Sequence, residues 1–135
     1  MTKDRILITG TVTNASEENI NLYNDIIDIC SNYSENISSP LDTMVFKGTN
    51  EERYLRAMEL LQGTKLLIAE MSYASTGQGM ELQEAIRLNI PIIVIAKENT
   101  KISGLLLGTN KVKTVIYYNN IDELKQKLSN YLKLN

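Results

Sequence analysis

The chain has 135 residues, of which 43% are hydrophobic and 22% are charged, as is typical of one globular domain spanning residues 1–135. A formal net charge of −2 provides no broad basic surface, so polymeric DNA or RNA is not an expected partner. The chain contains no histidine, which excludes histidine-ligated metals and every Ser-His or Cys-His nucleophile pair. We expect neither a metal nor a cofactor.

Two further features indicate where the protein works. The first ten residues contain too short an apolar run for a signal peptide, and no stretch is long enough to span a bilayer, so we expect a cytoplasmic protein without membrane contact. The single cysteine, Cys30, cannot form an internal disulfide. It lies in a helical pattern, where a small buried thiol is the common role and a catalytic thiol the less common one.

Apolar runs alternate with amphipathic segments along the whole chain. The first half predicts a buried strand at 5–9, a helix from a Ser16 cap to Tyr33, a polar loop with an edge strand at 43–46, and a helix from the capping box at 49–52 to Gly63. The second half predicts a buried strand at 65–70, a helix after the turn at 72–79, a strand at 91–96, a short helical piece at 103–107, a strand at 112–118 and a closing helix from Asn120.

This alternation predicts right-handed βαβ crossovers and a single doubly wound α/β domain of flavodoxin- or Rossmann-like type. Its five-stranded, mainly parallel sheet would carry helices on both faces. Ligands bind such sheets beyond the carboxyl ends of the strands, so we expect the loops after Thr9, Glu70 and Ala96 to face a ligand. Glu70 itself ends an apolar strand, and we expect it to accept hydrogen bonds from nearby loop backbone as part of the scaffold.

The turn from Ser75 to Gly79 precedes a helix and could present backbone N–H groups and hydroxyls to a phosphate. A plain strand-to-helix turn would have the same composition. We place Glu81 in the first turn of the helix, facing the same crevice, where a carboxylate can attack an anomeric carbon or stabilise an oxocarbenium ion. A solvated glutamate near a helix start is the simpler alternative.

The segment Lys65 to Ala85, KLLIAEMSYASTGQGMELQEA, resembles the core signature of the nucleoside 2-deoxyribosyltransferases. The most similar branch is that of the 2′-deoxynucleoside 5′-phosphate N-hydrolases. The signature has a strand ending in Ala-Glu, a Pro-Ser-x-Gly-x-Gly turn and an aromatic-Glu-Leu-Gly helix start. Ser75, Gly77, Gly79 and Glu81 match it, and the resemblance extends over nearly the whole chain.

The resemblance implies that Glu81 is a nucleophile that forms a covalent sugar ester, which water or a second base then resolves. It implies that Ser75 and, across a homodimer interface, Ser103 hold the 5′-phosphate. Gly10 and Thr11, in the turn after the first strand, would also contact the substrate. The implied activity is an N-glycosidic bond hydrolase, or a deoxyribosyl transferase, acting on nucleoside 5′-monophosphates.

Several positions depart from the family pattern close to the expected chemistry. The family's aspartate on the helix before the central strand aligns with Ala57, unless a shifted helix register lets a nearby glutamate replace it. The candidates are Glu51, Glu52 and Glu59, and the other departures are Leu7, Thr13, Ala74 and Gln83. A catalytically inactive nucleotide-binding or sensor protein is therefore the alternative. A phosphoacceptor domain of the same fold would need an acidic cluster after the first strand, and Thr9-Gly10 provides none.

Overall fold

The strands form one parallel sheet, as the apolar runs predict. The computed structural model describes residues 3–13 and 15–135. The sheet contains β1 (Arg5–Thr9), β2 (Ile37–Ser38), β3 (Thr64–Glu70), β4 (Ile92–Lys97) and β5 (Val112–Tyr118). Their order is β2-β1-β3-β4-β5 with every neighbouring pair parallel. This is the flavodoxin-like order, and it confirms the predicted fold class.

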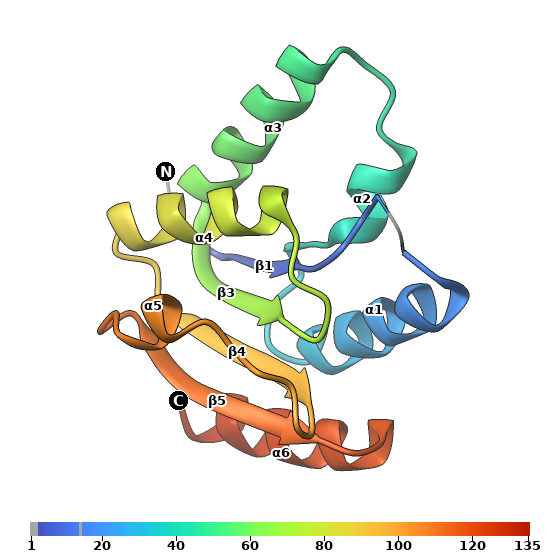
Figure 1. The fold of residues 1–135 in the computed structure, drawn as a ribbon, viewed down its shortest axis with the longest axis vertical. Coiled ribbons are helices and arrows are strands. Elements are labelled where there is room, and N and C mark those ends of the chain that lie inside the picture. The colour runs from blue at the N-terminus through green and yellow to red at the C-terminus, as the bar shows by residue number, and fades with distance from the viewer. Residues whose placement is uncertain (1–2, 14) are drawn as a thin grey trace.

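Helices cover both faces of this sheet (Figure 1). They are α1 (Glu17–Cys30), α2 (Pro40–Val45), α3 (Asn50–Gln62), α4 (Thr76–Arg87), α5 (Gly104–Leu107) and α6 (Ile121–Leu134). Helices α1 and α6 pack on one face, whereas α3 and α4 pack on the other. In the described part of the chain, no helix combines the length and apolar character that crossing a membrane requires.

The strand side chains divide between two cores because successive residues of a strand point to opposite faces. On β1, Ile6 and Ile8 join the core under α1 and α6, whereas Leu7 joins the core under α3 and α4. Cys30 belongs to the first core, and its burial raises the pKa of its thiol to about 12. The prediction of a small buried thiol is confirmed.

Local sequence sets the starts of the longer helices. Thr49 caps α3 by accepting the N–H of Glu52 at 3.1 Å, and the Glu52 carboxylate accepts the N–H of Thr49 at 2.9 Å. Ser16 caps α1 and Asn120 caps α6, as predicted. Helix α1 ends at Cys30, three residues before the predicted limit at Tyr33.

The predicted edge strand at 43–46 is wrong. Residues 43–45 belong to α2, and the edge strand is β2, six residues earlier in the chain. Ser39 and Asp42 form a reciprocal capping box, and Pro40 occupies the first helical turn, where its fixed φ suits a helix. These helix-start signals outweigh the β-branched residues that suggested a strand. Val45, the last residue of α2, is 76% exposed and contributes no buried side chain to either core.

Helix α4 also begins earlier than the predicted turn allows. Ser75 is its N-cap and accepts the N–H of Gln78 at 3.3 Å, so Gly77 and Gly79 are helical residues. Glu81 is consequently the sixth residue of α4 and lies in its second turn, not its first.

Candidate active site

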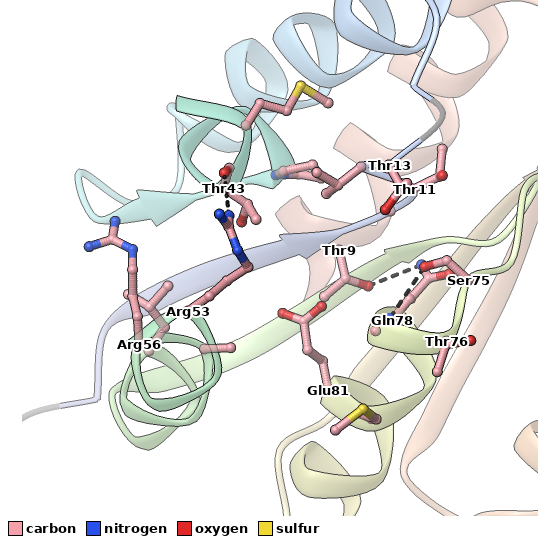
Figure 2. A pocket seen from close by; sticks show the side chains of 18 of the residues that line it. Thr9, Thr11, Thr13, Thr43, Arg53, Arg56, Ser75, Thr76, Gln78 and Glu81 are labelled. Carbon is pink, nitrogen blue, oxygen red and sulfur yellow. Dashed lines mark hydrogen bonds between the residues drawn. The ribbon is translucent and has the colours of Figure 1, made fainter. Parts of the chain in front are cut away.

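A cavity of about 920 Å³ opens at the carboxyl ends of β1 and β3. These two strands flank the point where the strand order reverses, which is where ligands bind in doubly wound sheets. Its walls come from the loop after β1, from α2 and α3, and from the first two turns of α4 (Figure 2). The volume lies within the range of about 300 to 1,000 Å³ that is usual for small-molecule sites.

The loop after β4, which was also expected to face the ligand, does not reach this cavity in the single chain. Among the described residues, none from 98–103 lines the cavity. The space is closed instead by α2 and α3, which connect β2 to β3 on the other side of the switch point. The loops after Thr9 and Glu70 do reach the cavity, as predicted.

Glu81 points into this cavity from α4 (Figure 2). Its side chain is half-buried, and no hydrogen bond or ion pair from residues 3–13 or 15–135 reaches its carboxylate. Burial without a compensating partner raises the pKa of the carboxyl to about 7. Near neutral pH the carboxylate is therefore available in both protonation states, with its oxygens free for a ligand.

The start of α4 forms the neighbouring wall, with Ser75, Thr76 and Gly77 in the lining. The first N–H groups of a helix have no acceptor within it, and the Ser75 hydroxyl takes only that of Gln78. A Cβ on Gly77 would meet nothing within 4 Å, so the backbone here is open to a ligand. Gly79 was expected in the substrate-binding turn, but it is a helical residue and does not line the cavity.

Sequence reasoning missed Gln78, which joins this wall to the sheet. It is 1% exposed, and its Nε2 donates to Thr9 Oγ1 at 3.1 Å and to the Glu70 carbonyl oxygen at 2.9 Å. Its Oε1 is buried and has no partner among the described residues. Gln78 thus anchors α4 three residues before Glu81, and no periodicity of the chain signals that role.

The first loop is shaped by Tyr23 of α1. A Cβ on Gly10 would collide with the Tyr23 hydroxyl and ring, so this position accommodates no side chain. The same hydroxyl donates to the Thr11 carbonyl oxygen at 2.8 Å. Gly10 and Thr11 both line the cavity, as does Thr13, whereas Asn14 lies outside the described residues.

Glu70 is a buried scaffold residue, as predicted. Its Oε1 accepts the Ser72 N–H at 2.7 Å and its Oε2 accepts the Tyr118 hydroxyl at 2.6 Å. Burial raises the pKa of this carboxyl, and the two hydrogen bonds oppose that rise. Glu70 does not line the cavity, so its hydrogen bonds fix the loop that leads to α4.

The α3 wall contains Ala57, so the position of the family's aspartate does face the cavity. None of Glu51, Glu52 and Glu59 lines it, and the suggested replacement of the aspartate by one of them is wrong. The helix register turns all three to the exposed side. The charged groups on this wall are instead Arg53 and Arg56, which sequence reasoning did not single out.

Ser103 lies apart from the cavity in a single chain. It is the exposed N-cap of α5, and its side chain makes no capping hydrogen bond. The structure therefore brings together Glu81, Ser75, Gly77, Gly10 and Thr11, and leaves Ser103 outside this group.

No family model matches the chain. A Methanosarcina mazei protein, provisionally named 2′-deoxynucleoside 5′-phosphate N-hydrolase 1, is 30% identical over 88 residues, which cover 64% of this chain and 55% of that protein. The CMP N-glycosidase of Clostridium botulinum superimposes with a TM-score of 0.70 at 21% identity, covering 94% of this chain and 98% of that one. A deoxyribosyltransferase from Leishmania mexicana gives 0.58 at 15%, covering 69% and 64%.

The chain spans about half the length of the curated relatives that it matches. The likeness to the solved structures, all at low identity, shows the fold. Together these comparisons confirm the family resemblance carried by the segment from Lys65 to Ala85. The three curated relatives are all provisionally named as 2′-deoxynucleoside 5′-phosphate N-hydrolases.

Proposed function

We propose that this chain, a relative of the nucleoside 2-deoxyribosyltransferases, hydrolyses the N-glycosidic bond of nucleoside 5′-monophosphates with Glu81 as the nucleophile. The observation that carries the proposal is the Glu81 carboxylate, half-buried and without a partner among the described residues, in the cavity at the switch point. A nucleophile needs free oxygens and weak solvation, and this environment provides both.

The start of α4 supports a position for the 5′-phosphate. The Ser75 hydroxyl and the N–H groups of Thr76 and Gly77 are suited to an anion, and the helix dipole adds partial positive charge. Glu81 lies four residues beyond Gly77, about 6 Å along the helix axis at a rise of about 1.5 Å per residue. The candidate anion site and the candidate nucleophile therefore lie on the first two turns of the same helix.

The proposed chemistry has two displacements at C1′. The ionised Glu81 attacks C1′, the C1′–N bond breaks with its electron pair on the base, and a glycosyl ester forms. The base takes a proton from solvent. Water then attacks C1′, the ester bond returns its pair to Glu81, and sugar 5-phosphate is released. A second base in place of water would make the reaction a transfer.

A homodimer completes the proposal. Ser103 is exposed and makes no capping bond, so its hydroxyl is available to the phosphate site of a neighbouring copy. The adjacent Leu105 and Leu107 are also exposed, at 91% and 44%, and apolar side chains in that position are suited to an interface.

One observation favours a second candidate, a nucleotide-binding protein without turnover. Ala57 occupies the wall where the family has an aspartate, and Glu81 is the one carboxyl among the described lining residues. If the reaction requires a second carboxyl near the base, this cavity would bind nucleotides without cleaving them.

The test is base release from a panel of ribo- and deoxyribonucleoside 5′-monophosphates, followed by chromatography. Wild type should release base, and Glu81→Ala should lower the rate by more than about a thousand-fold, as loss of a nucleophile does elsewhere. Glu84→Gln, on the same helix but outside the cavity, is the matched control and should retain activity. Binding without release by wild type would establish the second candidate instead.

A further inference from the structure

The charges around the cavity are unequal on its two sides. Among the described lining residues, Glu81 on α4 is the one carboxyl, whereas α3 contributes two arginines, the half-buried Arg53 and the exposed Arg56. The chain has no histidine to share either role. The α3 wall is therefore cationic. The cavity that it faces contains one carboxylate among the described residues, that of Glu81.

Arg53 is held in place on this wall by neutral partners. Its Nη1 donates to the Thr43 carbonyl oxygen at 3.2 Å, and its Cζ lies 5.4 Å from the centre of the Phe46 ring. Arg56 lies 5.2 Å from the same ring. No carboxylate in the described ranges lies within 4.0 Å of either guanidinium. Arg53 is half-buried, and most of its five N–H donors have no partner among the described residues.

Two cations beside one ring, without a counter-ion, favour a ligand that brings negative charge or strong acceptors. Figure 2 shows Arg53 and Glu81 on opposite walls, with Arg53 directed towards α2 and Glu81 into the space between them. If the phosphate lies at the start of α4, as proposed above, the base extends from Glu81 towards α3. Arg53 then faces the base.

We propose that Arg53 binds a keto oxygen of the base and stabilises the base as it departs, so that the substrates are nucleotides of 2-oxopyrimidines or 6-oxopurines. This inference rests on the proposed function. Two properties of the cavity support it. A guanidinium is a donor only, so it recognises carbonyl oxygens and not amino groups. An aminopurine leaves best when its ring is protonated. Among the described residues that line the cavity, no carboxyl other than the Glu81 nucleophile could provide that proton, so aminopurines should be poor substrates.

The departing step needs no acid from the protein. As Glu81 attacks C1′, the electron pair of the C1′–N bond moves to the ring nitrogen, and the negative charge spreads to the keto oxygen. Arg53 donates hydrogen bonds to that oxygen and keeps its own protons. Water then protonates the released base. Donors directed at developing charge are worth about a hundred- to a thousand-fold in rate.

The test compares base release from dIMP and from dAMP, which carry an oxo group and an amino group at C6, respectively. If wild type prefers ribose, IMP and AMP replace them. Wild type should cleave the oxo substrate at least about ten-fold faster in kcat/KM. Arg53→Gln should lower kcat on dIMP by about a hundred-fold, with little change on dAMP, and Arg53→Lys should recover part of the loss. Arg87→Gln, paired with Glu84 outside the cavity, is the control.

The outcomes separate the two proposals. Equal rates on dIMP and dAMP, or an equal loss on both in Arg53→Gln, would overturn the role of Arg53 and leave the glycosidase intact. Base release that does not need Glu81, or no release from any nucleotide, would overturn the proposed function and the leaving-group role with it. Thermal melts of each variant identify a loss that comes from misfolding.

Discussion

Glu81 combines a position in a ligand-sized cavity with burial that no neighbour compensates. Because burial raises the pKa of its carboxyl to about 7, wild-type kcat/KM should rise with pH through that value as the nucleophile ionises. Initial rates between pH 5 and 9 measure this, with the phosphate titration of the substrate as a reference. A profile that is flat between pH 6 and 8 would contradict the assigned role.

The same burial predicts a stability effect of Glu81→Gln. The folded carboxyl has a pKa of about 7 against 4.5 for the free group, so the folded state holds its proton more tightly. Wild type should therefore lose stability relative to the variant as pH rises from about 4.5 to 7, with a constant difference above that. Thermal melts at pH 4.5 and pH 8 test this. A stability difference between the variant and wild type that is the same at both pH values would contradict it.

Gly10 illustrates a steric requirement. A Cβ there meets the Tyr23 hydroxyl and ring, so Gly10→Ala should lower the free energy of unfolding by about 1 to 3 kcal/mol through overpacking. Tyr23→Phe removes the nearest atom and should recover part of this loss in the double variant. Urea denaturation of the single and double variants measures the coupling, and strict additivity would show that the two positions do not clash.

At the scale of elements, the Gln78 side chain joins the start of α4 to the sheet. Gln78→Ala removes two buried hydrogen bonds, to Thr9 and to the Glu70 carbonyl, and should cost about 1 to 3 kcal/mol of stability. If Gln78 also positions Glu81, kcat should fall more than KM rises. Steady-state kinetics well below the melting temperature test this, and an unchanged kcat would limit Gln78 to a structural role.

The α2 segment shows how local signals compete. Residues 43–46 have strand-like composition, yet the capping box of Ser39 and Asp42 starts a helix three residues earlier, at Pro40. This helix positions Thr43 and Phe46 beside Arg53. The part of the fold predicted wrongly is thus the part that organises the cationic wall, which is why the sequence did not reveal that wall.

For the whole molecule, the proposed dimer makes a prediction that a monomer cannot satisfy. Light scattering should give a dimer, and Ser103→Asp should abolish activity by repelling the phosphate in the neighbouring site. Mixing Ser103→Asp with Glu81→Ala should restore activity, because one site of each heterodimer would then contain both lesions and the other neither. A monomer, or mixtures that stay inactive, would remove Ser103 from the site.

Sequence patterns were enough to predict the doubly wound fold class, most helix starts, the buried Cys30 and the place of Glu81 on the helix after the central strand. These follow from apolar periodicity, capping residues and a contiguous motif, all of which act over a few residues. Three relations became visible in the folded chain alone: Gln78 links α4 to β1, Ala57 faces the cavity, and Arg53 lies opposite Glu81. Those relations join residues far apart in the chain, and they depend on how helices pack over the sheet, which no local pattern encodes.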